Sequence, residues 1–314
     1  MSKTQLILNQ LCLGQEAKLN RWFNCTCYLA PFKPNSYETD TEELNTKLLT
    51  LTIQGGTEDK PLSGGNARLV PWSKFRYFIR RVIIKGKIVF DEKHTNLSGL
   101  FHYCGELEEI IGLENLDTTN VTDMSQMFRR CKKLTRLNLL NLNTSNVTNM
   151  TEMFDRCKSL TELDLSNFNT RNVIYMTRMF NKCKQLTQLN TCNFNTRNVD
   201  IMEGMFSNCS SLTELDLNHF DMLKLRHFSY MFENCTSLIK VNFPKRYKFN
   251  HWFIKGMYRN CSSLKSVDLS MFHFAPFEAR GLLYNCNQLE SVKFTVTIDV
   301  SSSLKYIYNY NGYD

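Results

Sequence analysis

Apolar residues recur along most of the chain with a period of 26 residues. The clearest copy of the pattern runs from Met150 to Phe168, and a nearly identical copy follows from Met176 to Phe194. Aligned on its cysteine, the repeat reads V-x-x-M-x-x-M-F-x-x-C-x-x-L-x-x-L-x-L-x-x-F-N-T. A period of about 20 to 50 residues is typical of arrays in which each unit packs on its neighbours.

The first half of the repeat has apolar residues three or four positions apart. This spacing predicts one buried face of a helix of about three turns. Asn146 precedes that face and is predicted to cap the helix, and Asn120, Asn172 and Asn198 hold the same position in other repeats. The face itself consists of Val147, Met150, Met153, Phe154 and Cys157.

The second half of the repeat changes period, because Leu163 and Leu165 alternate with polar residues and predict a short strand. A single unit cannot bury its own apolar side chains, and ordering it costs about 1–2 kcal/mol per residue. The units are therefore predicted to stack, with the strands in one parallel sheet and the helices along the opposite face. The predicted core positions are Met150, Met153, Phe154, Cys157, Leu160, Leu163, Leu165 and Phe168.

The extent of the period divides the chain into four parts. Residues 97–295 carry the repeat, in about eight units. Residues 46–96 contain short apolar runs and are predicted to form an N-terminal cap with short strands, because the first repeat would otherwise expose its apolar edge. Residues 1–45 form an N-terminal segment without a clear assignment, and residues 296–314 form a C-terminal tail or cap.

The cysteines follow the same period. Because free cysteine packs like a small apolar residue, a buried row of thiols explains their positions better than disulfides or a metal site. Of the 12 cysteines, eight hold one position in the repeat: Cys104, Cys131, Cys157, Cys183, Cys209, Cys235, Cys261 and Cys286.

Composition narrows the class of protein. An apolar content of 42% is typical of a folded protein, and the net charge of +8 comes without a nucleic-acid-binding motif, so no nucleic acid is expected as a partner. No apolar run reaches the ~20 residues of a membrane helix, so no transmembrane segment is predicted. Asn9 and Gln10 interrupt the first apolar run too early for a convincing export signal.

Motifs of catalysis are absent from the sequence, which has no P-loop, no G-x-G-x-x-G, no H-E-x-x-H and no G-x-S-x-G. The six histidines share no position in the repeat. We therefore expect a protein that is not an enzyme and that has no catalytic residues, no cofactor and no metal site. A column of alternating Asn and Asp, from Asn138 to Asp268, offers oxygen ligands for a cation, but a solvated strand face is the favoured interpretation.

Partner binding is expected at columns of exposed residues, which stacking creates from equivalent positions. The first candidate lies on the strand face and consists of Arg136, Glu162, Gln188, Glu214 and Lys240. The second lies in the basic and aromatic segment 240–255, where an eroded repeat is the favoured alternative, and consists of Lys245, Arg246, Lys248 and Trp252. A basic band on the predicted helix side is interpreted as a solvated face, with docking of an acidic partner as the alternative; it consists of Arg129, Arg130, Lys132, Lys133, Arg156, Lys158, Lys182 and Lys184.

The stretch from Asn143 to Thr170, with the lead-in from Ile83 to Phe90 and from Gly112 to Phe128, resembles the BspA-like leucine-rich-repeat surface-protein family. The resemblance covers about residues 48–295. It implies an α/β leucine-rich-repeat solenoid of about eight helix-strand units, with a parallel sheet on one face and a small N-terminal capping region.

The same resemblance implies a recognition protein displayed at a cell surface or secreted, with a role in adhesion and a protein or glycan as its ligand. The alternative is a cytoplasmic scaffold for protein–protein interaction, or a truncated gene product without export.

Overall fold

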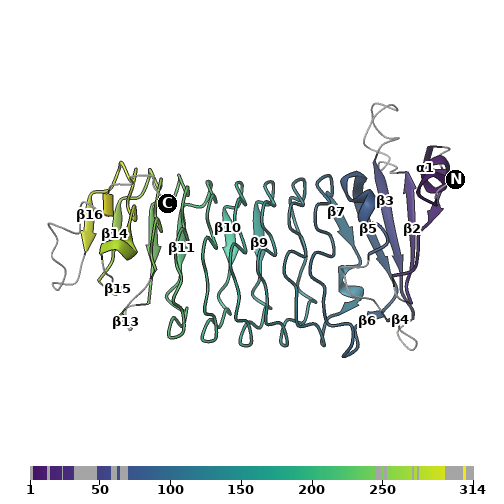
Figure 1. The fold of residues 1–314 in the computed structure, drawn as a ribbon, viewed down its shortest axis with the longest axis horizontal. Coiled ribbons are helices and arrows are strands. Elements are labelled where there is room, and N and C mark those ends of the chain that lie inside the picture. Colours follow the sequence, from purple (N-terminus) through teal and green to yellow (C-terminus); the bar gives the residue numbers. More distant parts are fainter. Residues whose placement is uncertain are drawn as a thin grey trace.

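A computed structural model shows an elongated solenoid that extends from a small N-terminal sheet (Figure 1). Each repeat makes one turn, about eight in all, and successive turns lie side by side along the long axis. The structure describes residues 3–12, 15–22, 24–31, 48–57, 62–63, 70–244, 249–250, 253–270, 272–273, 276–293 and 307–308.

The N-terminal part is a five-stranded sheet of order β1-β2-β3-β5-β7, and helix α1 (Lys3–Cys12) lies against β1 and β2. The first two strand pairs are antiparallel, whereas β3, β5 and β7 are parallel. Because β7 belongs to the first repeat, this sheet leads directly into the solenoid. The strands are β1 (Ala17–Lys18), β2 (Thr26–Pro31), β3 (Leu49–Gln54), β5 (Ile79–Lys85) and β7 (Glu109–Ile111).

Smaller elements complete this region. A second parallel sheet has the order β4-β6-β8, and two short 3₁₀ helices flank β5 and β8. Gly112 lies between β7 and η3 with φ of 81°. A Cβ at this position would be 2.0 Å from the carbonyl oxygen of Ile84, so glycine allows the backbones of Gly112 and Ile84 to come this close. The elements are β4 (Leu62–Ser63), η2 (Ser73–Phe78), β6 (Ile88–Val89), η3 (Leu113–Asn115) and β8 (Leu116–Asp117).

One face of the solenoid carries the predicted strands. They are short and pair in parallel across neighbouring turns, β9 with β10, β11 with β12, and β14 with β16. In β9, Leu163 is buried between two exposed residues, as the alternation of the sequence predicts. The strands are β9 (Glu162–Asp164), β10 (Gln188–Asn190), β11 (Glu214–Asp216), β12 (Lys240–Asn242), β14 (Ser266–Asp268) and β16 (Ser291–Lys293).

A second line of parallel pairing runs along the solenoid, with one residue from each turn. It joins Asn96, Asp123, Asn149, Tyr175, Ile201, His227 and Phe253 in that order. Towards the C-terminal end, β13 (Phe249–Asn250) pairs with β15 (Phe272–His273), and η4 (Pro276–Ala279) follows.

The predicted helix of each repeat is wrong. Within residues 97–244 and 253–270 the structure contains no α-helix, and the segment with helical spacing is a chain of tight turns. Its backbone N–H groups alternate between two kinds of partner. Met153 N–H donates to Met150 within the repeat, whereas Phe154 N–H donates to the carbonyl of Met179 in the next repeat, at 2.9 Å. The α/β helix-strand unit is therefore replaced by a unit of strand and turns.

Positive φ angles explain why this segment cannot be helical. Glu152 has φ of 55° and Arg156 has φ of 62°, and the equivalent residues of the other turns do the same. A left-handed residue at the third position of a four-residue turn is the signature of a type II turn and ends any right-handed helix. These turns direct every second N–H group along the solenoid axis, where it joins one repeat to the next.

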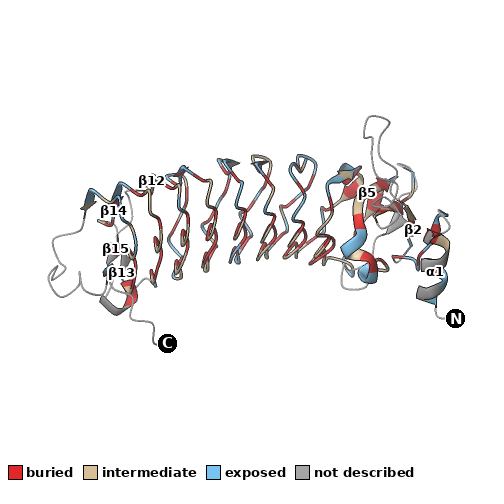
Figure 2. Cartoon of the chain, turned by 90° about the horizontal axis from the view of Figure 1, so that it is seen from above, coloured by how far each residue is buried: buried red, intermediate tan, exposed pale blue. Residues whose placement is uncertain are grey.

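The turns still bury every third or fourth side chain, which is why the helical spacing is misleading. All eight predicted core positions of the unit, Met150 to Phe168, are at most 3% exposed. Figure 2 shows buried positions along the inside of each turn throughout the solenoid.

One ring per turn forms a continuous aromatic column. Phe154 and Phe180 are 5.7 Å apart and nearly parallel, and the stack begins at the cap, where Trp72 lies 6.5 Å from Phe101. Trp72 also contacts Trp22 at 5.6 Å, so the cap and the repeats share one core. The column consists of Phe101, Phe128, Phe154, Phe180, Phe206, Phe232 and Tyr258.

Candidate recognition surfaces

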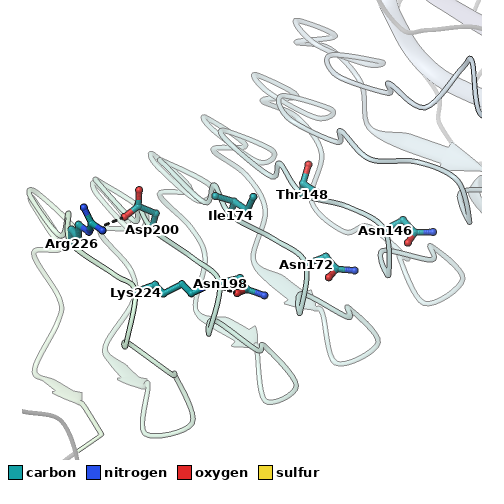
Figure 3. A pocket seen from close by; sticks show the side chains of 8 residues that line it. All are labelled: Asn146, Thr148, Asn172, Ile174, Asn198, Asp200, Lys224 and Arg226. Atoms are coloured by element: carbon teal, nitrogen blue, oxygen red, sulfur yellow. Dashed lines mark hydrogen bonds and ion pairs between the residues drawn. The ribbon is translucent and has the colours of Figure 1, made fainter.

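A groove crosses four turns on the side of the single-residue pairing (Figure 3). It has a volume of about 640 Å³ and is open to solvent. Two columns line it, two positions apart in the repeat. They consist of Asn146, Asn172, Asn198 and Lys224, and of Thr148, Ile174, Asp200 and Arg226.

The asparagines of the groove have their side chains fixed by the backbone. The amide of Asn146 donates to the carbonyl of Thr119 at 2.8 Å, and the amides of Asn172 and Asn198 donate to equivalent carbonyls of the preceding turns. The prediction that these residues cap helices is therefore wrong, because no helix follows them. Each asparagine instead joins two turns.

Charge accumulates at the C-terminal end of the groove. Lys224 donates to Asn198 at 2.8 Å, and Arg226 lies 3.8 Å from Asp200 in an exposed ion pair. Exposed ion pairs of this kind contribute about 0–1 kcal/mol, so they open readily for a partner. The groove thus changes from neutral amides and hydroxyls at one end to cations at the other.

Partly exposed side chains border the groove at the next position of each turn, and from Tyr175 to Phe253 they are apolar or aromatic. Ile174 and Tyr175 are 37% and 44% exposed. Further along, the rings of His227 and Phe253 stack at 5.0 Å, and Phe253 is 46% exposed. Aromatic side chains beside cations are the residue types that dominate protein interfaces.

The strand-face candidates do form a column. Glu162 lies opposite Gln188, and Glu214 lies opposite Lys240. Arg136 and Glu162 are 3.2 Å apart in an exposed ion pair.

The second set of predicted partner-binding residues lies outside the described part of the chain. These residues are Lys245, Arg246, Lys248 and Trp252. They remain a prediction.

The Asn/Asp column on the strand face has a structural role. The side-chain oxygen of Asp164 accepts the backbone N–H of Ser166 at 3.0 Å, and Asn190 and Asp216 accept the N–H two residues on in the same way. Each residue therefore stabilises the turn that ends its strand. In the parts of the chain that the structure describes, no group of three or more His, Cys, Asp or Glu is placed to hold a metal ion.

The cysteine row is buried and hydrogen-bonded. The thiol of Cys157 donates to the carbonyl of Phe128 at 3.1 Å, and Cys209 donates to Phe180 in the same way. Burial raises the pKa of the Cys235 thiol to about 12, so the reactive thiolate is not formed near neutral pH. These cysteines belong to the core rather than to a reactive site.

The groove was missed by sequence reasoning because its asparagines were assigned to helix caps. The signal lies in the comparison of equivalent positions: the sequence changes from Asn146 and Thr148 to Lys224 and Arg226, whereas the core residue between each pair stays apolar, from Val147 to Leu225. Columns that change in polarity beside columns that stay apolar indicate an exposed surface that packing does not fix.

No match is found among curated proteins. A crystal structure of a leucine-rich repeat protein from Eubacterium ventriosum is similar at 15% identity, over 89% of this chain and 85% of that chain, with a TM-score of 0.34. No helix in the described residues is long and apolar enough to cross a membrane.

A family model described as "Mycoplasma protein of unknown function, DUF285" matches residues 95–193 and 187–272. The two matches overlap and together cover more than half of the chain, in the part that carries the 26-residue repeat. The chain therefore belongs to the family described as Mycoplasma protein of unknown function, DUF285.

Proposed function

We propose that this protein is a non-enzymatic recognition scaffold, and that it binds an extended segment of a partner protein in the groove of Figure 3. The observation that carries the proposal is the contrast between columns. The core columns stay apolar in every turn, whereas one column of the groove changes in character at each turn, from Thr148 through Ile174 and Asp200 to Arg226. Solenoids commonly use such a lateral surface for binding.

The groove suits an extended chain that runs along the solenoid axis. The groove is lined by residues of four successive turns, so a segment that lies along it contacts each of these turns. Fixed amide groups of Asn146 and Asn172 supply hydrogen-bond acceptors without further ordering. The apolar column with Ile174 and Tyr175 supplies area to bury, and Lys224 and Arg226 favour an acidic residue at one end of the partner segment.

Selection of peptides on the purified full chain tests this proposal. A phage library of random 12-residue peptides is enriched on the protein, and the selected peptides are measured by fluorescence anisotropy. The double variant Ile174→Arg and Arg226→Glu should weaken binding at least about tenfold, because it replaces an apolar contact and reverses a charge. The matched control Glu162→Ala removes an exposed charge from the strand face and should leave binding unchanged.

Equal binding of the selected peptides to the groove variant and to the native chain would contradict the proposal. Enrichment of peptides whose binding depends on Glu162 would move the binding site to the strand face.

The cellular setting that fits the BspA-like resemblance is display at a cell surface for adhesion, with an intracellular interaction scaffold as the alternative. Fractionation of cells that express the tagged native protein separates the two. Recovery in the surface fraction is expected for adhesion, and recovery in the cytosol alone would contradict it.

A further inference from the structure

Two rows of cations run along the turn edge of the first repeats, about ten positions after the groove in each unit. The inner row consists of Arg130, Arg156 and Lys182, and the outer row consists of Lys132, Lys158 and Lys184. We call these six residues the basic edge. The three residues of the outer row are exposed.

The positive charges of the basic edge are concentrated in three short segments of the chain. The segments 129–133, 155–159 and 181–185 hold eight Lys or Arg residues and one acidic residue, Asp155, which is buried and faces Arg129 at 2.9 Å. The whole chain has a net charge of only +8. The same positions of the next turn, 207–211, read S-N-C-S-S and carry no charge. The fold itself therefore does not require cations here.

The inner row occupies strained backbone positions. Arg130, Arg156 and Lys182 have φ of 64°, 62° and 62°. The left-handed region costs an ordinary residue about 1–2 kcal/mol, and asparagine tolerates it better. Later turns use asparagine at this position, with φ of 60° at Asn234 and at Asn260. The second to fourth repeats thus keep cations where an uncharged residue fits the backbone better, which points to a function.

The lysines of the outer row repel one another and so lower the stability of the fold. Side chains at equivalent positions of adjacent turns are ~4.8 Å apart, and like charges that face each other at this spacing destabilise the pairing. Within the described residues, no carboxylate lies at ion-pair distance from the ammonium groups of Lys132, Lys158 or Lys184. A bound polyanion would remove this repulsion.

We propose that the basic edge binds a linear anionic polysaccharide that runs across the turns, with a carboxylate or sulfate group on successive sugar units. One sugar unit of an extended polysaccharide is about as long as the step between turns. An extended peptide places side chains of one face ~6.8 Å apart, two residues of ~3.4 Å each, and stacked nucleic acid repeats its phosphates every ~3.4 Å along a strand. Both are out of step with ~4.8 Å.

A hollow at the end of the inner row favours a sugar over other anions. It has a volume of about 350 Å³ and lies over Gly204, where the equivalent residues of neighbouring turns are Arg178 and Tyr230. Lys182 lines the hollow together with two ion-paired carboxylates, Glu203 at 3.3 Å from Arg178 and Glu233 at 3.5 Å from Arg259. Carboxylates repel a dense polyanion, but they accept hydrogen bonds from sugar hydroxyl groups.

This inference does not rest on the proposed function, because the basic edge and the groove use different residues. The test uses the full chain and measures binding to dextran sulfate, to polyuronate, to neutral dextran, to polyglutamate and to a 20-residue oligothymidylate. Both anionic polysaccharides should bind more tightly than polyglutamate and oligothymidylate, and neutral dextran should not bind. Binding should weaken as salt increases, because exposed charges are screened.

The decisive variant replaces Lys132, Lys158 and Lys184 by serine, the residue at this position in Ser210 and Ser262. It should lose affinity for dextran sulfate at least about tenfold, since three exposed charge contacts are removed. The matched control replaces Lys85, Lys93 and Lys265 by serine and lowers the net charge equally. It should lose less than about twofold.

A second variant, Ser210→Lys, extends the outer row by one turn and should strengthen binding, so the test does not depend on loss alone. Equal losses in the decisive variant and its control would overturn the proposal, because net charge alone would then explain binding. Tighter binding of polyglutamate or oligothymidylate than of the polysaccharides would also overturn it.

Discussion

The thiol of Cys183 donates a hydrogen bond of 3.2 Å to the carbonyl oxygen of Phe154 in the preceding repeat. The same bond recurs from Cys131 to Cys286, with lengths of 3.0 to 3.3 Å. The acceptor is in each case the backbone carbonyl of a residue of the aromatic column, so each turn is joined to the previous one by a ring contact and a thiol contact. The repeat therefore encodes contact between turns more than structure within a turn.

The buried thiols are expected to be unreactive in the folded protein. Among the cysteines that the structure describes, Cys192 is exposed, whereas the row from Cys104 to Cys261 is buried. Brief labelling with a thiol reagent at pH 8, followed by peptide mapping, should find Cys192 modified and Cys157 protected until denaturant is added. If Cys157 were labelled as fast as Cys192 in the native protein, the thiols of the row would be accessible to solvent and the prediction would be wrong.

The same row is expected to make the protein unstable in alkali. Burial raises the pKa of Cys104 and of Cys235 from 9.0 to about 12. The unfolded chain loses these protons first, so their contribution to stability is fully present below about pH 9 and is lost as pH rises towards 12. Each thiol contributes up to about 1.4 kcal/mol per pH unit in this window.

The midpoint of thermal unfolding should therefore fall steeply between pH 9 and pH 11. Cys235→Ala should lower the midpoint at pH 8 but flatten its decrease with pH, because one buried titrating group is gone. Cys192→Ala is the control and should leave the slope unchanged, since that thiol is exposed. A midpoint of thermal unfolding that stays constant from pH 8 to pH 11 would contradict this prediction.

The burial of residues could be predicted from the sequence, whereas the backbone of half the repeat could not. Met150, Met153, Phe154 and Cys157 are all fully buried, as a helical face would be. A run of tight turns, in which residues with negative and positive φ follow one another, can also place every third or fourth side chain inward. The apolar period alone therefore does not distinguish such a run from a helix. The distinguishing feature is the positive φ of Glu152 and its equivalents. The sequence marks it only in some repeats, where glycine holds this position at Gly99, Gly204, Gly256 and Gly281.

Strands were predictable where alternation was clear. The alternation from Leu48 to Ile53 predicts a strand and becomes β3, and the apolar runs around Gly86 become β5 and β6. The groove and the basic edge could not be predicted as sites, because they exist only where separate turns bring equivalent positions together. The cations of the edge were visible in the sequence, but their strained backbone was not.

Loss of one ring from the aromatic column should weaken the whole array. Phe180 stacks on Phe154 at 5.7 Å and on Phe206 at 5.5 Å. Phe180→Ala removes both contacts and should cost about 3–5 kcal/mol. Because each repeat contacts only its neighbours, the two halves of the solenoid should then unfold in separate steps.

Urea unfolding followed by circular dichroism checks this result, with Tyr175→Ala as the control. Tyr175 lies in an adjacent column but is 44% exposed, so its replacement should change the free energy of unfolding by less than about 0.5 kcal/mol. A single transition of unchanged midpoint for Phe180→Ala would contradict the role of the column.

The strained position of Lys182 should be relieved by the residue that later turns use. Lys182 has φ of 62°, and Asn208 holds the same position one turn on with the same angle. Lys182→Asn should raise the free energy of unfolding by about 1 kcal/mol, because asparagine adopts the left-handed conformation at lower cost. Lys182→Val should lower it, since a β-branched residue is strained at positive φ.

Lys184→Asn is the matched control, because it removes the same charge two residues away, where φ is not positive. It should change the free energy of unfolding by less than about 0.5 kcal/mol. A gain for Lys182→Asn together with weaker binding to dextran sulfate would show that the basic edge gives up stability for binding. A decrease in the unfolding midpoint of Lys182→Asn would mean that the lysine is the better residue for this turn, and the strain argument for a function of the inner row would fail.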